Sequence, residues 1–442
     1  MSTTFGYLHP KSGRQLDFFY EKLYIYGGDE NMNKIYKRED YLKKIRGFYN
    51  DSAMIKVITG IRRCGKSFLL KSIMEELRDN GVKEKNIINI ELDSKEYKDI
   101  TTPAELEKLI DSLIKDKDFK YIFIDEVQNV ANYEKLINAY REEGNYSIFL
   151  TGSNSYLLSG ELVTKLTGRY IEIEVLPLNF YEYVDMKKFL GKNVSANIYH
   201  EFEEYIRDGG FPGSLMYDNH NEKVRYAKGV IGQIFEKDIK NHKKIQDKEL
   251  FEIIEKYIVN NFGAIISIGN IYKYLTESLK INVDRRTIKT YIELLENAKI
   301  IYPCDLFDMK SKRVLDGEKK YYLADLSIYY ALNTDNRINY GPVLENVLFI
   351  YLMSHDYSLS VGRIGNLECD FIARRGIDKY FYLQVAKNVQ EEKTFKREYR
   401  PFYEIKEMYP RYLFLADIIL QDNIDGINNV NIVDFIYENR EL

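Results

Sequence analysis

A glycine-rich stretch near residue 60 has the residue types and the spacing of a phosphate-binding loop. Gly60 and Gly65 are separated by four residues, and Lys66 and Ser67 follow directly. Glycines let backbone N–H groups curl around phosphate oxygens, the lysine reaches the terminal phosphates, and the serine hydroxyl binds Mg²⁺. The stretch, whose residues 60–67 we call the P-loop, therefore predicts a site for ATP and Mg²⁺. Its predicted binding residues are Gly60, Ile61, Arg62, Arg63, Cys64, Gly65, Lys66, Ser67 and Phe68.

Two adjacent acids, Asp125 and Glu126, end the apolar run KYIFI. A P-loop requires a further acid for the metal ion, so Asp125 is expected to share Mg²⁺ with Ser67. Glu126 is expected to polarise the water that attacks the terminal phosphate. The next apolar run ends in the polar tip Thr151 to Asn154. Asn154 is therefore expected to lie near the γ-phosphate as a sensor.

Arg169 follows Gly168 at the start of another apolar run. Together with Glu126 and Lys66 it completes the predicted catalytic set, as an arginine finger for the nucleotide of its own or of a neighbouring subunit. The alternative is an ordinary surface arginine that opens a strand. A finger acting on a neighbour would require a homo-oligomer, and the sequence alone leaves the oligomeric state open.

These side chains need elements that bring them together. Apolar strands alternate with helical patterns through the first 180 residues, and their polar ends carry the residues named above. This alternation predicts an α/β fold with a doubly wound parallel sheet, in which ligands bind at the carboxyl ends of the strands. The carboxylate pair and the polar tip favour the division of P-loop proteins that contains AAA+ ATPases, with the fourth strand between the first and the third.

Residues 250–326 have the pattern of a winged helix: three helical segments and then a hairpin. Asp284 is expected to cap the third helix, whose first residues would meet DNA. Basic side chains lie on that helix and on the wing, namely Arg285, Arg286, Lys289, Lys310, Lys312 and Arg313. Double-stranded DNA is the favoured partner, and docking to a protein is the alternative, because acids are interleaved through the same segment.

From Gly341 the order helix, strand, strand, helix, strand resembles the core of PD-(D/E)xK nucleases. That family surrounds a metal ion with acids and uses a lysine to orient water. The candidate positions here are Glu345, Glu368, Asp370 and Gln384. Side chains alternate along a strand, so the residue that shares the face of Gln384 is Ala386, and Lys387 points to the other face. A bulge at Lys387, or a lysine of the next helix (Lys393 or Lys396), could supply the missing group.

Composition limits the function classes. The chain has 442 residues, which predicts two to four domains, and its formal net charge of −4 argues against a generally basic nucleic-acid coat. No apolar run reaches the length of a membrane span, and three scattered cysteines fit a reducing cytosol, so a cytoplasmic protein without membrane contact is expected. The predicted boundaries are 1–35 for an N-terminal extension, 36–180 for the P-loop ATPase domain, 181–245 for a helical lid, 246–330 for the winged helix and 331–442 for the nuclease-like domain.

A succession of five motifs resembles a known family. The motifs are Gly60-Ile-Arg-Arg-Cys-Gly-Lys-Ser67, Phe123-Ile-Asp-Glu-Val-Gln128, Leu150-Thr-Gly-Ser-Asn154, Thr167-Gly-Arg169 and Gly209-Gly-Phe-Pro212. They are similar to bacterial and archaeal AAA-family ATPases that pair an AAA domain with a DUF4143 C-terminal region, and the similarity covers nearly all of the chain beyond residue 35. The resemblance implies ATP binding and hydrolysis, and it gives weight to Arg169. It also implies a degenerate nuclease-like domain, because DUF4143 tails often lack the catalytic lysine.

Three functions are consistent with these patterns. The first is a Mg²⁺-dependent ATPase that acts as a nucleotide-driven switch or handles DNA. The second is an ATP-dependent nuclease, and the third is a protein-binding switch of the STAND type without a nucleic-acid function. The presence or absence of DNA-stimulated ATP hydrolysis separates the first from the third.

Overall fold

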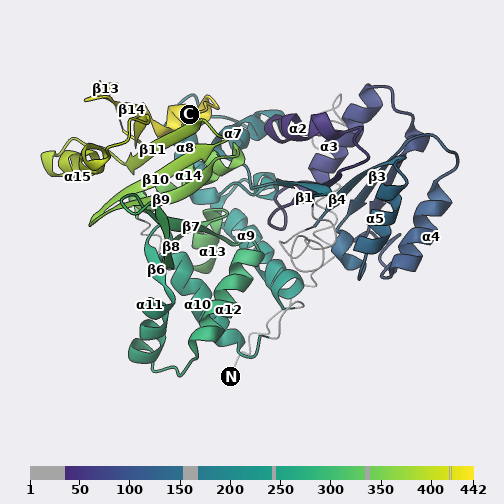
Figure 1. The fold of residues 1–442 in the computed structure, drawn as a ribbon, viewed down its shortest axis with the longest axis horizontal. Helices are drawn as coiled ribbons and strands as arrows, with labels where there is room; N and C mark the ends of the chain where they lie inside the picture. Colours follow the sequence, from purple (N-terminus) through teal and green to yellow (C-terminus); the bar gives the residue numbers. More distant parts are fainter. Residues whose placement is uncertain (1–34, 153–167, 241–244, 334–338, 418, 420) are drawn as a thin grey trace, which may run out of the picture.

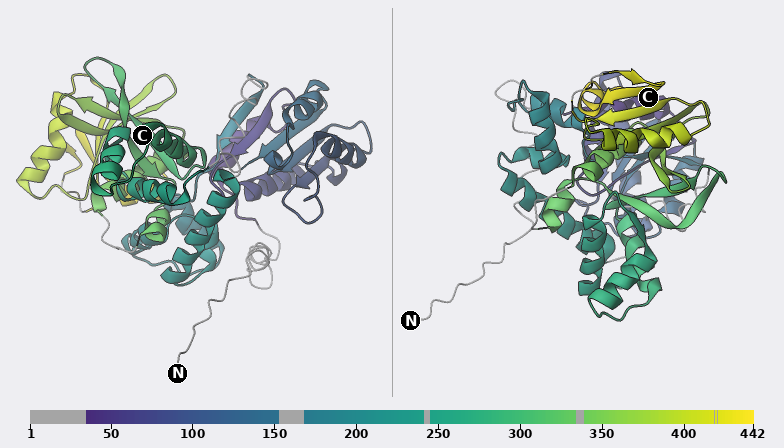
Figure 2. Two further views of the ribbon diagram at one scale, coloured as in Figure 1. Left: turned by 90° about the horizontal axis from the view of Figure 1, so that it is seen from below. Right: turned by 90° about the vertical axis from the view of Figure 1, so that its left-hand side faces the viewer.

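The computed structural model describes residues 35–152, 168–240, 245–333, 339–417, 419 and 421–442. The expected N-terminal extension therefore lies almost wholly outside the described residues, and so does Asn154. Two β-sheets lie at opposite ends of the view in Figure 1, with helices between them. Seen from below in Figure 2, the molecule forms two lobes, one around each sheet.

The first sheet is parallel, with the strand order β2-β3-β4-β1-β5. Its strands are β1 (Ile55–Thr59), β2 (Ile87–Glu91), β3 (Lys120–Asp125), β4 (Tyr146–Thr151) and β5 (Tyr170–Glu174). The fourth strand lies between the first and the third, as the sequence predicts. The three central strands β1, β3 and β4 are buried along their whole length because helices cover both faces of the sheet.

Alternate side chains of these strands belong to two separate cores. One face packs against α2 and α3, and the other packs against α4 and α5. The helices of this lobe are α2 (Glu39–Ile45), η1 (Arg46–Phe48), α3 (Lys66–Asp79), η2 (Glu84–Asn86), α4 (Pro103–Leu113), η3 (Val127–Asn129) and α5 (Glu134–Glu142). Both cores end at the carboxyl edge of the sheet, where β1, β3 and β4 carry the residues predicted to bind nucleotide.

Helices connect this sheet to the rest of the chain. They are α7 (Phe180–Phe189), α8 (Ile198–Asp208), the short helix η5 (Pro212–Met216), α9 (His220–Ile234) and η6 (Phe235–Ile239), a π-helix that continues α9. Side-chain amide oxygens cap three of the long helices, which fixes their first turns. We call residues 180–239 the lid helices.

A helix–hairpin unit follows, with the elements that the sequence predicts for a winged helix. It contains α10 (Lys248–Asn260), β6 (Ile265–Ser267), α11 (Ile268–Lys273), the π-helix η7 (Tyr274–Ser278), α12 (Arg285–Asn297), β7 (Ile301–Asp308), β8 (Arg313–Leu323) and α13 (Ser327–Leu332). Asp284 caps α12, and its carboxylate accepts a hydrogen bond of 2.6 Å from the backbone N–H of Arg286. The predicted cap is confirmed.

The hairpin of this unit and the C-terminal strands form one mixed sheet, in the order β13-β14-β12-β11-β10-β9-β7-β8-β6. The C-terminal elements are α14 (Tyr340–Ser354), β9 (Ser358–Ile364), β10 (Leu367–Arg375), β11 (Lys379–Ala386), α15 (Glu392–Glu404), β12 (Arg411–Leu415), β13 (Asn423–Ile424), β14 (Ile427–Asn431) and α16 (Ile432–Tyr437). The junction is the parallel pair β7 and β9, with Leu306 opposite Val361. Within the described ranges, no helix has the length and apolar character that crossing a membrane requires.

Candidate nucleotide site and the nuclease-like cluster

The P-loop leaves β1 and leads into α3. Gly60 has φ +138°, and a Cβ there would lie 2.1 Å from the carbonyl oxygen of Val175, so only glycine fits. Gly65 has φ +109° and precedes the first residue of α3. Lys66 is 4% exposed, and its ammonium donates to the carbonyl oxygens of Gly60 at 3.0 Å and Ile61 at 3.2 Å. The lysine charge is therefore held inside the loop that is predicted to surround the phosphates.

The acidic pair lies beside this loop, at the end of β3. The hydroxyl of Thr151, at the end of β4, donates to the carboxylate of Asp125 and accepts from the backbone N–H of Glu126 at 3.0 Å. Burial, with the neighbouring charge of Glu126, raises the pKa of Asp125 to about 6, although hydrogen bonds from Thr151 and Ser67 oppose the shift. The buried carboxylate of Asp125, the partly exposed one of Glu126 and a serine hydroxyl form a set of hard oxygen donors. These donors fit Mg²⁺, whose charge would favour the ionised form of Asp125.

A small apolar pocket of about 40 Å³ lies beside the P-loop. Four segments line it: residues before α2 (Ile35, Tyr36, Arg38), the start of α3 (Gly65, Phe68, Leu69, Ser72), α7 with the residue two positions before it (Leu178, Met186, Phe189), and η5 (Pro212). Its walls are apolar and aromatic, but its volume is far below that of pockets that hold a ligand of the size of a nucleotide base and sugar, so it does not by itself define a base site. Among the residues predicted from the sequence, only Gly65 and Phe68 line this pocket. The sequence did not predict the other residues that line the pocket, because they come from segments that are distant in the chain.

The Gly209-Gly210-Phe211-Pro212 loop connects this pocket to the C-terminal lobe. The carbonyl of Gly210 accepts from the backbone N–H of Leu178 at 2.8 Å, and the N–H of Gly210 donates to the carboxylate of Asp325 at 2.5 Å. Pro212 lies at the pocket and is the nearest neighbour that a Cβ on Gly65 would meet. The loop therefore joins the nucleotide site to the segment that follows β8.

Replacing Gly210 with alanine is expected to lower the free energy of unfolding by about 1–3 kcal/mol, since the new Cβ would overlap the backbone of Leu178. That Cβ would lie 2.1 Å from the carbonyl oxygen of Leu178. The control is Gly229→Ala in the exposed face of α9, where nothing lies within 4 Å and a gain of up to about 1 kcal/mol is expected. Urea unfolding measures both, and equal midpoints for the two variants would show that Gly210 is not held as described.

Arg169 lies at the opposite end of the sheet from the P-loop, directly before β5. Its backbone carbonyl accepts from the N–H of Ile55, at the start of β1. Its guanidinium is exposed and contacts Asn138 at 3.4 Å and Glu142 at 3.9 Å, both on α5. The structure does not bring Arg169 to the nucleotide site of its own chain, so a role as an arginine finger would have to be exercised on a neighbouring subunit.

The nuclease-like residues surround a lysine that the sequence analysis did not single out. Lys320, on β8, is 3% exposed, and its ammonium lies 2.9 Å from a carboxylate oxygen of Glu345 and 2.8 Å from one of Glu368. The hydroxyl of Tyr322 also donates to Glu345, at 2.8 Å. The cation in this cluster is therefore an ammonium contributed by the hairpin of the preceding unit.

Asp370 and Gln384 lie beside this cluster and are tied to the neighbouring backbone. Asp370 accepts from the N–H of Val385 at 2.8 Å, and its own N–H donates to Gln384 at 3.2 Å. Burial and the charge of Glu345 hold the pKa of Asp370 well above its usual value, although Lys320 lowers it. Lys387, in contrast, lies 5.2 Å from the ring of Tyr340. Among the residues that the structure describes, no group of three His, Cys, Asp or Glu side chains is placed to hold a metal ion.

The basic residues of the helix–hairpin unit are exposed to solvent. Arg285 stacks on the ring of Tyr272 at 4.9 Å, and Lys289 lies 3.8 Å from Glu293. Arg286 is exposed at the start of α12, as are Lys310, Lys312 and Arg313 at the tip of the hairpin. The charges predicted to meet DNA are thus accessible, although one of them is already paired.

The parallel sheet with the order β2-β3-β4-β1-β5, a P-loop after β1 and a carboxylate pair after β3 define a P-loop ATPase of the AAA type. Residues 52–184 match the family described as "AAA domain". Residues 199–338 match a "Domain of unknown function (DUF8612)". The expected DUF4143 region is not shown, and DUF8612 is the family matched in this part of the chain.

Relatives extend over most of the chain. An "Uncharacterized protein" of Haemophilus influenzae is 33% identical over 403 residues, which are 91% of this chain and 98% of the relative. "Uncharacterized protein MJ1544" of Methanocaldococcus jannaschii is 31% identical over 332 residues, 72% of this chain and 71% of the relative. The chain belongs to the family of these proteins.

Solved structures with a similar fold include the Walker-type ATPase paby2304 of Pyrococcus abyssi. It has a TM-score of 0.48 at 18% identity, over 68% of this chain and 96% of that one. Cdc6p of Pyrobaculum aerophilum has a TM-score of 0.31 at 11% identity, over 64% of this chain and 91% of its own.

Proposed function

We propose that the protein is a Mg²⁺-dependent ATPase that acts as a nucleotide-driven switch. The observation that carries this proposal is the meeting of the P-loop, Asp125, Glu126 and Thr151 at one edge of the parallel sheet. ATP is the nucleotide, with its phosphates in the P-loop.

Each residue has a separate role in the proposed reaction. Lys66 neutralises charge on the terminal phosphates, while Ser67 and Asp125 hold Mg²⁺, which supplies further neutralisation when bound. Glu126 orients the attacking water and accepts its proton. Thr151, the first residue of the polar tip of β4, orients Asp125 through its hydroxyl. This contact is its part in the sensor role predicted for that tip.

The output of the switch is proposed to be the helix–hairpin unit, with double-stranded DNA as its partner. The exposed arginines at the start of α12 and the basic tip of the hairpin support DNA. Docking of a protein to the same surface is the alternative, and the pairing of Lys289 with Glu293 favours it. The three cysteines are buried free thiols, which supports a reducing compartment such as the cytosol.

ATP hydrolysis measured with and without double-stranded and single-stranded DNA tests this proposal. Duplex DNA is expected to stimulate turnover at low salt, and 0.5 M salt is expected to remove the effect because ions compete for the basic residues. The double variant Arg286→Ala, Lys289→Ala should lose the stimulation, whereas Lys256→Ala on α10 should keep it. If DNA does not change the rate of ATP hydrolysis at any salt concentration, DNA is rejected as the partner and a protein partner is favoured.

An ATP-dependent nuclease is the further alternative. Lys320 supplies a lysine next to the acids, as such a nuclease requires, but its ammonium forms ion pairs with Glu345 and Glu368, the acids that would have to hold the metal ion. No DNA cleavage is expected with Mg²⁺ or Mn²⁺. Metal-dependent cleavage that disappears in Asp370→Ala would reverse this conclusion.

A further inference from the structure

Arg62 is an arginine of the P-loop that is buried beside the proposed catalytic acid. It is 8% exposed, and its guanidinium lies 4.0 Å from a carboxylate oxygen of Glu126. The same carboxylate oxygen accepts a hydrogen bond from the side chain of Gln128. A guanidinium in this position lies at the end of the site where the γ-phosphate is expected, because Glu126 is expected to act on the water that attacks it.

The principal partner of Arg62 belongs to the lid helices. Two of its nitrogens donate to the two carboxylate oxygens of Asp238, at 3.0 and 2.9 Å. Asp238 is 3% exposed and lies on the π-helix η6, which continues α9. The neighbouring Lys237 contacts Asp93, two residues beyond the end of β2, at 3.2 Å. The π-helix therefore lies against the carboxyl edge of the sheet and is anchored there through ion pairs.

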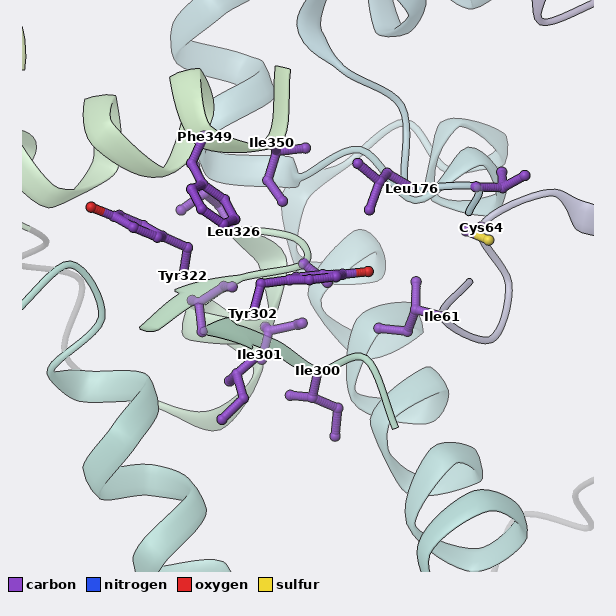
Figure 3. Close-up of a cluster of buried hydrophobic side chains, with 14 of the residues drawn as sticks. Ile61, Cys64, Leu176, Ile300, Ile301, Tyr302, Tyr322, Leu326, Phe349 and Ile350 are labelled. Atoms are coloured by element: carbon purple, nitrogen blue, oxygen red, sulfur yellow. The ribbon is translucent and has the colours of Figure 1, made fainter. Parts of the chain in front are cut away.

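Two further residues of the P-loop are packed into the rest of the molecule. Ile61 and Cys64 are fully buried in the core that includes Tyr302 of β7, and Figure 3 shows them with Leu176 around that tyrosine. The hydroxyl of Tyr302 donates to Glu174, at the end of β5, at 2.8 Å. The P-loop is thus in direct contact with the hairpin as well as with the lid helices, so a change in its conformation would affect both.

We propose that Arg62 distinguishes ATP from ADP by exchanging its contact with Asp238 for a contact with the γ-phosphate, which releases the π-helix η6. The inference rests on the proposed ATP site and deepens it. A guanidinium forms the same bidentate contact with a carboxylate or a phosphate, so the two acceptors compete for one planar donor. ADP lacks the γ-phosphate and leaves the pair intact. ATP thus favours the state in which η6 is released from Arg62, because it binds that state more tightly than the state in which Arg62 pairs with Asp238.

Binding measurements on three variants test the exchange. Affinities for ATP and ADP are measured by calorimetry in the Glu126→Gln background, in which ATP stays intact. Arg62→Gln is expected to weaken ATP by about 10-fold to 100-fold and to leave ADP unchanged, since one charged hydrogen-bond pair is lost. Asp238→Asn is expected to do the opposite and tighten ATP, because the competing carboxylate is neutralised. Arg46→Gln, which breaks a surface pair with Glu39 and Glu76, is the matched control.

Hydrogen exchange supplies a readout that does not depend on hydrolysis. ATP, and not ADP, should accelerate exchange of the amides of residues 235–239, and Arg62→Gln should abolish the difference. An unchanged preference for ATP in Arg62→Gln, or weaker ATP binding in Asp238→Asn, would overturn the exchange. If neither nucleotide binds the unmodified protein, the proposed ATPase itself fails. If both bind and Arg62→Gln has no effect, only this inference fails.

Discussion

Lys66→Ala is expected to lose ATP binding, whereas Glu126→Gln is expected to bind ATP normally and to stop turning it over. The ammonium of Lys66 is the charge held inside the P-loop, by the carbonyls of Gly60 and Ile61. Without it the terminal phosphates lose their main cation. The Glu126→Gln change keeps the size of the side chain and removes its capacity to accept a proton. Turnover is expected to fall by about 10²-fold to 10³-fold.

Calorimetry measures binding and phosphate release measures turnover, so the two variants are assigned to separate steps. Lys135→Ala, an exposed lysine on α5, is the control and should leave both unchanged. Normal hydrolysis by Glu126→Gln would show that another group activates the water. Unchanged ATP affinity in Lys66→Ala would remove the P-loop from the proposed site.

The second large effect concerns stability. Lys320→Met is expected to lower the free energy of unfolding by about 3–5 kcal/mol, because Glu345 and Glu368 would keep their charges without the buried cation that compensates them. The neighbouring Lys319 provides a matched control, since its side chain is 39% exposed and pairs with Asp305 at 3.2 Å. Lys319→Met should cost less than about 1 kcal/mol.

The pH dependence of the Lys320→Met effect follows from Asp370. Its pKa is already raised by burial and by Glu345, and Lys320 is the group that opposes the rise. A carboxyl group whose pKa is raised by folding binds more protons in the folded state than in the unfolded state. Its contribution to the free energy of unfolding therefore decreases as the pH rises. The loss in free energy of unfolding that Lys320→Met causes should therefore become smaller as the pH falls from 7 toward 5. A deficit of the same size in both lysine variants, at every pH, would contradict the proposed cluster.

The parts of the fold that depend on local sequence were predictable. The P-loop and the acidic pair follow from motif spacing and from apolar runs, and the cap at Asp284 follows from one residue type at a helix start. The order of the parallel sheet followed from the likeness of these motifs to the AAA+ division of P-loop proteins. The alternation argument for β11 was also sound, since Lys387 does not join the acids of the nuclease-like cluster but lies at the ring of Tyr340.

The parts that depend on distant pairing were not predictable. The cation of the nuclease-like cluster comes from β8, and no pattern around Glu345 or Asp370 points there. The partner of Arg62 lies on a π-helix 176 residues downstream, and no sequence pattern indicates that these two residues are neighbours. The apolar pocket beside the P-loop is formed by four segments that are distant in the chain. In each case the missing information is which elements lie side by side, which side-chain periodicity does not contain.

The pairing of β7 with β9 has a practical consequence for dissecting this protein. A cut in the connection between α13 and α14 would separate two strands that are hydrogen-bonded to each other from Leu306 to Asp308. Each fragment would then present an unpaired strand edge with apolar residues, which favours association with other chains. The helix–hairpin unit and the C-terminal strands should therefore be produced together, and a DNA-binding assay on either fragment alone would report on exposed edges as much as on the surface of α12.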